Sequence, residues 1–413
     1  MRMNKFLVIC GVAISLFMLP MFSGYDAEPK TVKIGATGAL KSKEGVQIKR
    51  WLELLAERLN KEGGLVVKGE RHNVQMVIYD DDLTVEGGRA AGERLINQDK
   101  VKYVICQFNS PPVLGVLSVA QPNKVLQIGN GITEKTMEPQ NQYYYRCPSL
   151  FFNALQPFYT KYYKETASSP SVVILAPDDA TGHGGAENYK IIYKNMGVKV
   201  LDSLFYKRET TDYTPFATKV KSYNPGFVDT GPTNAGAPTL LLAKALYEVG
   251  YKGGKIFNNM GETWKDIVEK VSPEAAEGSM CSFRDPRQYR KDKWVQELCD
   301  AYEKKYGIWE TDGVSWISGW WVLMAAIKKA DSLDVEDLRK ALNGLETDTL
   351  SGKVRFVARP DLKNPRTCDS VAEMTPGIVK NGKFQPLKTI SVDEGYELVI
   401  KAFGLEDVYK LKK

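Results

Sequence analysis

The hydrophobic pattern of the chain alternates between short apolar runs and longer segments with helical periodicity. Continuous runs rich in Val and Ile predict strands buried on both faces, as in a parallel sheet. These runs lie at Val32–Thr37, Val74–Tyr79, Val101–Cys106, Val125–Ile128, Val172–Ala176, Val198–Phe205, Phe227–Asp229 and Lys255–Asn258. Helical spacing fills the intervals, as in Val46–Glu62, whose apolar face carries Ile48, Leu52, Leu55 and Leu59. The repeating order of strand and helix predicts an α/β fold built on parallel sheets with right-handed crossovers.

The alternation of strands and helices falls into two series along the chain. A chain of 413 residues is also longer than one hydrophobic core usually serves, so we expect two lobes. The first crossing between them is expected at Cys147-Pro148, and Gly278–Phe283 is expected to be a strand that returns to the first lobe. A third crossing is expected in the C-terminal part. The predicted division gives residues 30–147 and 278–356 to the first lobe, and residues 148–277 and 357–400 to the second.

Polar loops follow two of the predicted neighbouring strands. Asn109 and Ser110 come after Val101–Cys106, and Gly131 and Thr133 come after Val125–Ile128. In open α/β sheets ligands bind beyond the carboxyl ends of the strands. Backbone N–H groups at the following helix starts, helped by the two hydroxyls, would suit a small anion such as a carboxylate. The alternative is that Ser110 and Thr133 only cap helices.

The first 24 residues have the features of a secretory signal. Arg2 and Lys5 precede an apolar run, Phe6–Phe22, which Pro20 interrupts and polar residues end. We expect a mature chain that begins between Ser23 and Glu28; an uncleaved membrane anchor is the alternative. The composition, 43% hydrophobic and 26% charged, is that of a soluble globular protein. A net charge of +6 without basic blocks among aromatics argues against nucleic-acid binding.

The cysteines and histidines restrict the possible redox and metal chemistry. Of six cysteines, Cys10 lies in the signal, so the mature chain keeps five, an odd number in an oxidising compartment. If a disulfide forms, Cys281 and Cys299 are the pair we expect. No C-x-x-C spacing occurs and the chain has two histidines, so no metal site is expected.

Catalytic motifs are missing from the sequence. Gly182-His183-Gly184-Gly185 lacks the G-x-G-x-x-G spacing of a dinucleotide loop, and no nucleophile elbow, H-E-x-x-H or phosphate loop occurs. We therefore expect neither an enzyme nor a cofactor. Thr181 is expected at a helix start facing the cleft. Trp316 begins an aromatic helix whose tryptophans are mostly expected in the core, but Trp316 could reach the cleft.

Several segments together resemble a known family. They are VKIGATGAL from Val32, LNKEGGL from Leu59, VIYDDD from Val77, VKYVI from Val101, VLQIGNGIT from Val125, TTDYTPFATKVKSYNPGFV from Thr210 and EGSM from Glu277. In order and spacing the chain resembles, from about residue 31 to 390, the type I periplasmic solute-binding proteins, in the branched-chain amino-acid (Leu/Ile/Val) branch that serves ABC transporters. The resemblance implies two Rossmann-like lobes joined by three hinge crossings that close over a ligand.

The resemblance also implies roles for individual residues. Ser110, Gly131 and Thr133 match the family's cradle for the ligand carboxylate, and Thr181 falls where an aromatic cleft residue often sits. The acid that receives the ligand ammonium falls at Met260, and the nearest acid is Glu262. The cysteine pair of the amino-acid binders falls at Leu83 and Asn109, so that disulfide is not expected here.

The function expected from this reading is capture of a small carboxylate-bearing solute, a hydrophobic or branched-chain amino acid first, by a periplasmic monomer that delivers it to an ABC transporter permease. An aromatic or other organic acid or amide is the alternative ligand. A ligand-sensing subunit of the same fold is the alternative role.

Overall fold

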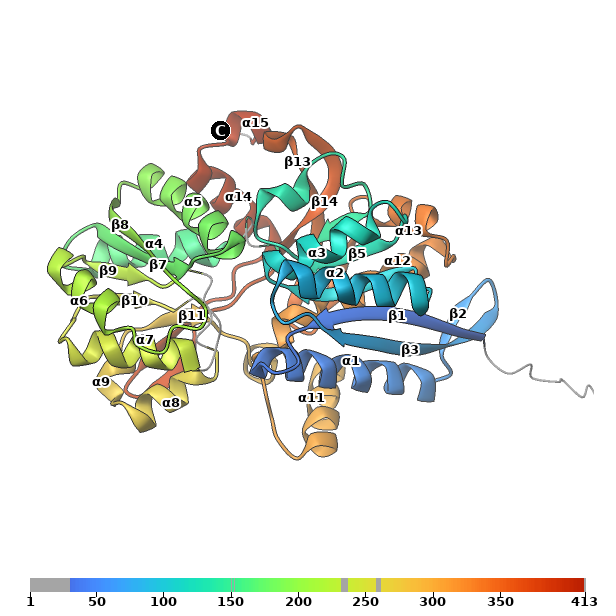
Figure 1. The fold of residues 1–413 in the computed structure, drawn as a ribbon, viewed down its shortest axis with the longest axis horizontal. Coiled ribbons are helices and arrows are strands. Elements are labelled where there is room, and N and C mark those ends of the chain that lie inside the picture. Colours follow the sequence, from blue (N-terminus) through green and yellow to red (C-terminus); the bar gives the residue numbers. More distant parts are fainter. Residues whose placement is uncertain (1–29, 150, 152, 232–236, 258–260, 412–413) are drawn as a thin grey trace, which may run out of the picture.

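The computed structural model describes residues 30–149, 151, 153–231, 237–257 and 261–411, and they form two α/β lobes (Figure 1). The expected signal segment lies outside these residues. None of the described helices combines the length and apolar character needed to cross a membrane. The two-lobed α/β architecture predicted from the alternation of strands and helices is confirmed.

The described first lobe is built on a nine-stranded sheet. Its order is β12 (Glu346–Thr349), β13 (Gly352–Arg359), β14 (Asn364–Ala372), β6 (Tyr144–Arg146), β5 (Leu126–Asn130), β4 (Tyr103–Phe108), β1 (Lys30–Gly38), β3 (Glu70–Asp80) and β2 (Leu65–Val67). Strands β3, β1, β4, β5, β6 and β14 run parallel, and antiparallel hairpins close both edges. The central strands are buried on both faces, as their apolar runs predict.

Helices cover both faces of this sheet. They are α1 (Lys43–Lys61), α2 (Val85–Glu93) with its π-helical extension Arg94–Gln98, α3 (Ser110–Ala120), α10 (Pro286–Tyr289), α11 (Lys293–Tyr306), α12 (Ser318–Ala330) and α13 (Val335–Leu342), with 3₁₀ turns at Glu134–Met137, Val314–Ile317 and Pro360–Leu362. Helix α1 shows why such elements form: Ser42 caps it by accepting the Gly45 N–H at 3.1 Å, and Ile48 and Leu52 are buried in the core.

The described second lobe has a seven-stranded sheet. Its order is β16 (Lys383–Pro386), β15 (Pro376–Lys380), β11 (Met280–Ser282), β10 (Gly254–Ile256), β9 (Phe227–Asp229), β7 (Ser171–Pro177) and β8 (Lys199–Tyr206). Its helices are α4 (Leu155–Thr166), α5 (Ala180–Asn195), α6 (Thr214–Tyr223), α7 (Ala237–Glu248), α8 (Thr263–Lys270), α9 (Pro273–Ala276), α14 (Val392–Phe403) and α15 (Glu406–Tyr409).

Three crossings join the lobes, as expected. The chain passes from β6 to α4, from β11 to α10, and from β14 to β15. The first begins at the expected Cys147-Pro148, a cis peptide bond.

The sequence assigned two strand segments to the wrong lobe. Gly278–Phe283 was expected to return to the first lobe, but β11 pairs in parallel with β10 and antiparallel with β15, inside the second sheet. Residues after 356 were expected in the second lobe, but β13 and β14 continue to Ala372 in the first sheet. Both errors have one cause: the antiparallel partners that fix these strands come from the C-terminal hundred residues, whose apolar runs are short.

The expected disulfide between Cys281 and Cys299 is also wrong. Cys281 lies in β11 and packs in the core of the second lobe, whereas Cys299 lies in α11 and packs in the core of the first. A bridge requires Cα atoms within about 7 Å. Cysteines in the separate cores of two lobes do not meet this condition.

Candidate functional site

The loops that follow β4 and β5 meet the start of α5, which belongs to the other lobe. The Ser110 N–H donates to Thr181 Oγ1 at 2.9 Å across this contact. Gly184, in α5, faces Thr133: a Cβ at this position would lie 3.4 Å from the Thr133 Cα, in ordinary van der Waals contact. Asn109, at a φ of 70°, directs the chain into α3. The structure thus brings together four of the residues that the sequence predicted for the site, Asn109, Ser110, Thr133 and Thr181.

The backbone amides expected to hold a carboxylate are bound by side chains in this closed arrangement. Ser110 Oγ accepts the N–H groups of Ile132 at 2.9 Å and Thr133 at 3.0 Å. The Gly131 N–H donates to the Tyr144 hydroxyl at 2.9 Å. A carboxylate would have to displace these partners. The role of Ser110, Gly131 and Thr133 as a ligand cradle stays a prediction.

A buried ion network holds the same loop in place. Arg146, with no solvent-exposed surface, donates to the carbonyls of Gly131 at 3.2 Å and Ile132 at 3.1 Å, and to Asp369 Oδ1 at 2.9 Å. Arg359 donates to the other Asp369 oxygen at 2.9 Å. Burial opposes ionisation of Asp369, but the two guanidinium groups outweigh it and lower its pKa below the usual value. The loop after β5 is therefore fixed by a charge network that the apolar pattern does not reveal.

On another flank of the cleft, three charged residues join the lobes; we call Lys43, Glu262 and Asp312 the interlobe clasp. Lys43 Nζ lies 2.9 Å from Glu262 Oε2 and 3.1 Å from Asp312 Oδ2. The Glu262 N–H donates to Asp312 Oδ1 at 2.9 Å, and Glu262 Oε1 accepts the Thr311 N–H. Burial, followed by the Asp312 carboxylate, raises the pKa of Glu262. Because Lys43 already occupies Glu262, this acid holds the lobes together in the structure.

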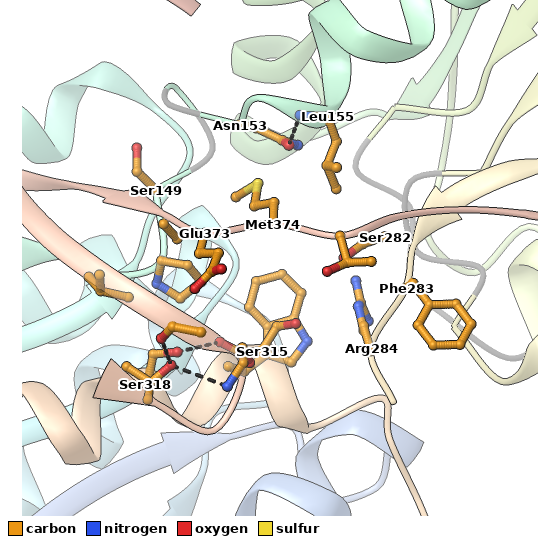
Figure 2. Close-up of a pocket in the computed structure, with 18 of the residues that line it drawn as sticks. Ser149, Asn153, Leu155, Ser282, Phe283, Arg284, Ser315, Ser318, Glu373 and Met374 are labelled. Carbon is orange, nitrogen blue, oxygen red and sulfur yellow. Dashed lines mark hydrogen bonds between the residues drawn. The ribbon is translucent and has the colours of Figure 1, made fainter. Parts of the chain in front are cut away.

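A cavity lies where the three crossings meet the first lobe (Figure 2). Its volume is about 90 Å³, and a water molecule needs about 10–15 Å³ of such space, so one small organic molecule fits. Its walls are mainly apolar with interspersed hydroxyls. They are formed by Pro148, Ser149, Asn153, Leu155, Tyr189, Ser282, Phe283, Arg284, Tyr289, Ser315, Trp316, Ser318, Thr349, Ser351, Gly352, Val354, Ala372, Glu373, Met374 and Thr375. An apolar pocket with a few placed polar groups is the usual form of a small-molecule site.

Trp316 and Arg284 are two large side chains with polar tips in the wall of this cavity. Trp316 is 7% exposed and stacks on Phe108, the last residue of β4, at 6.0 Å between ring centroids. The Arg284 guanidinium carbon lies 5.3 Å from the Trp316 ring centroid, within cation–π range. Arg284 is 5% exposed, and its Nη1 donates to the Asp312 carbonyl at 3.4 Å. A buried cation thus faces an aromatic ring at the wall of the cavity.

The sequence-predicted site residues therefore divide into three places. Asn109, Ser110, Gly131, Thr133 and Thr181 gather at the contact between α3 and α5, Glu262 lies in the clasp, and Trp316 lines the cavity. Met260 lies outside the described residues. Among the described residues no three His, Cys, Asp or Glu side chains are grouped to hold a metal ion.

Sequence reasoning missed Arg284 and Glu373, the charged residues of the cavity. Each lies directly after or just beyond a strand end, in a crossing, and an isolated charge beside a short strand gives no distinctive signal.

Comparisons with known proteins agree with this geometry. The family model described as periplasmic binding protein matches residues 31–377. The leucine-, isoleucine-, valine-, threonine- and alanine-binding protein of Pseudomonas aeruginosa is 24% identical over 353 residues, which cover 83% of this chain and 90% of that protein.

Solved structures share the fold. A leucine-binding protein from Thermotoga maritima is 17% identical with a TM-score of 0.71, covering 88% of this chain and 99% of that one. A solute-binding protein of an ABC transporter from Rhodopseudomonas palustris, in complex with p-hydroxybenzoic acid, is 20% identical with a TM-score of 0.73. The match covers 89% of this chain and 99% of that one. The family is one of substrate-binding receptors that act outside the cytoplasm. The chain belongs to the periplasmic binding proteins, as a solute-binding protein of the ABC-transporter type.

Proposed function

We propose that this protein captures a small organic carboxylate in the cavity between its three crossings and delivers it to an ABC transporter permease in the inner membrane. The observation that carries the proposal is the composition of the cavity wall: Leu155 and Tyr189 come from the second lobe, Trp316 from the first, and Arg284 and Met374 from two crossings. A molecule bound there touches both lobes, so its binding energy favours the closed arrangement.

The relatives bind different solutes, so the ligand class must come from the residues of this chain. The names of the curated relatives specify amino acids, whereas several fold neighbours hold benzoate or hydroxybenzoates. A buried arginine in a largely apolar cavity favours an anionic ligand with an apolar body, a description that fits both classes. We expect a periplasmic monomer with its signal segment removed.

The test is a binding panel of leucine, phenylalanine, benzoate and 4-hydroxybenzoate, measured by calorimetry and thermal unfolding. A ligand present at one hundred times its dissociation constant adds about 2.7 kcal/mol of stability. Met374→Trp should fill the cavity and abolish binding of whichever solute binds. Met196→Trp is the matched control, because Met196 is equally half-buried but ends α5 away from the cavity.

Binding by the wild type and by Met196→Trp, with loss in Met374→Trp, supports the proposal. If no member of the panel binds, or if Met374→Trp binds as tightly as the wild type, the cavity is not the solute site.

A further inference from the structure

We infer that Arg284 is the anchor for the ligand carboxylate and that the solute is an aromatic acid without an α-amine. This inference rests on the proposed function, because it assigns the ligand class of the same cavity. It differs from the cradle prediction in placing the carboxylate at the second crossing, not at the loops after β4 and β5.

The position of Arg284 suits a carboxylate. The side chain follows Phe283 immediately after β11, is 5% exposed and lines the cavity. A guanidinium group presents five N–H donors in a planar fork that matches two carboxylate oxygens. The Arg284 Nη1 donates to the Asp312 carbonyl at 3.4 Å, which places the guanidinium at the cavity wall.

Trp316 offers the surface for the apolar part of the ligand. Its ring stacks on Phe108, and the Arg284 guanidinium lies within cation–π range of the same ring. The buried Trp316 Nε1 has no hydrogen-bond partner among the described residues, which leaves a donor at the cavity wall. An aromatic ring can contact the edge of Trp316, Phe283 and Tyr289 while its carboxylate faces Arg284.

Four acids of the chain that could receive an α-amine have other partners. Glu262 is bound by Lys43, Asp178 by His183 at 2.8 Å, and Asp179 by Arg208 at 2.5 Å. Asp229 accepts from Gln156 at 2.6 Å and from Tyr193. None of these four lines the cavity. A buried ammonium without an acid beside it is costly.

Glu373 is the acid that does line the cavity, and it enters from the third crossing. In Figure 2 Glu373 and Arg284 lie on opposite sides of the view, and both line the cavity. The amine and carboxylate of an α-amino acid share one carbon, so a carboxylate bound to Arg284 would hold the ammonium beside this arginine. A hydroxyl at the far end of an aromatic acid can donate to Glu373 while the carboxylate meets Arg284. The geometry therefore favours a hydroxylated aromatic acid, for which 4-hydroxybenzoate is the probe.

The experiment compares benzoate, its uncharged analogue benzamide, 4-hydroxybenzoate and phenylalanine by calorimetry on the wild type and Arg284→Met. A hydrogen bond to a charged group is worth about ten- to a hundredfold in affinity, so Arg284→Met should weaken benzoate by that factor and leave benzamide nearly unchanged. Arg287→Met is the matched control, because Arg287 stacks on Trp309 at 4.1 Å outside the cavity. Arg284→Lys keeps the positive charge but loses the planar pair of donors, so its benzoate affinity should lie between those of the wild type and Arg284→Met.

Each outcome decides a separate claim. If no acid binds the wild type, the proposed function fails. If acids bind and Arg284→Met weakens benzoate and benzamide equally, Arg284 has a structural role and the anchor is refuted. Phenylalanine binding tighter than 4-hydroxybenzoate refutes the ligand class. The preference for 4-hydroxybenzoate over benzoate should disappear in Glu373→Met, and its persistence there would refute the contact to Glu373.

Discussion

Lys43→Met tests how firmly the interlobe clasp holds the closed arrangement. Lys43 Nζ neutralises two carboxylates, Glu262 from the second lobe and Asp312 from the first, and the Asp312 side chain is fully buried. Without the ammonium the two carboxylates face each other across the closed interface. Breaking a buried ion pair costs about 3–5 kcal/mol, but Lys43 keeps 37% of its side-chain surface exposed, so solvent screening reduces the cost to about 1–2 kcal/mol.

That cost applies to closure, because opening the lobes separates Glu262 from Asp312. A shift of about 1–2 kcal/mol lowers the ratio of closed to open molecules five- to thirtyfold. The apparent affinity for any solute then falls by up to the same factor. The loss should be equal for leucine and benzoate, since the clasp does not line the cavity. Asp312→Asn added to Lys43→Met removes the repulsion, keeps an acceptor for the Glu262 N–H, and should restore part of the affinity.

The assay is calorimetry with each solute, together with small-angle scattering of the ligand-free variants. Lys41→Met is the control, since the partners of Lys41 among the described residues are Asp80 and Asp82 of its own lobe, and Lys41 is exposed. An unchanged affinity and scattering profile in Lys43→Met would show that the interlobe clasp does not stabilise the closed arrangement. A loss confined to leucine would instead assign Glu262 to the ligand ammonium, as the sequence suggested.

Two further predictions concern the cradle and a buried lysine. Because Thr133 does not line the cavity, Thr133→Ala should change benzoate affinity by no more than about 0.5 kcal/mol in calorimetry; a ten- to hundredfold loss would place the carboxylate in the cradle after all. Lys255 is 8% exposed, and burial, with a smaller effect of Lys252, lowers its pKa from 10.5 to about 8. The folded state thus binds fewer protons than the unfolded state between these values, so stability should rise as pH increases through this window. Lys255→Met should add roughly 2–3 kcal/mol at pH 7 and flatten that rise in urea unfolding, whereas the exposed-site control Lys161→Met should not; a wild-type pH dependence in Lys255→Met would contradict this.

Local sequence patterns predicted the central strands because burial on both faces demands continuous apolar residues. Val101–Cys106 and Val125–Ile128 correspond to β4 (Tyr103–Phe108) and β5 (Leu126–Asn130) within two residues. Strand β14 was missed because Asp369 and its polar neighbours read as a loop. That aspartate is buried only because Arg146, 223 residues earlier in the chain, and Arg359 neutralise it. An ion pair between residues so far apart in the sequence produces no recognisable pattern in the local sequence.

In the candidate site, residues at strand ends could be predicted from the sequence, whereas charged residues in the crossings could not. Residues at strand ends, such as Ser110 and Thr133, were expected together because carboxyl ends of parallel strands share one sheet edge, and they do lie together. Trp316 was singled out as the tryptophan that could reach the cleft from the helix start, and it lines the cavity. Arg284 and Glu373 could not be found, since their placement at one cavity depends on where the second and third crossings run. Glu262 was noticed for its sequence position, but its partner Lys43 lies far away in α1.

The most direct measurement is a crystal structure of the protein with the aromatic acid that binds most tightly in the panel. We predict that the acid lies between the three crossings, with its carboxylate within hydrogen-bond distance of the Arg284 guanidinium and its ring against Trp316. An acid held at Ser110 and Thr133 with the Arg284 cavity containing only water, or bound outside the interlobe region, would contradict it.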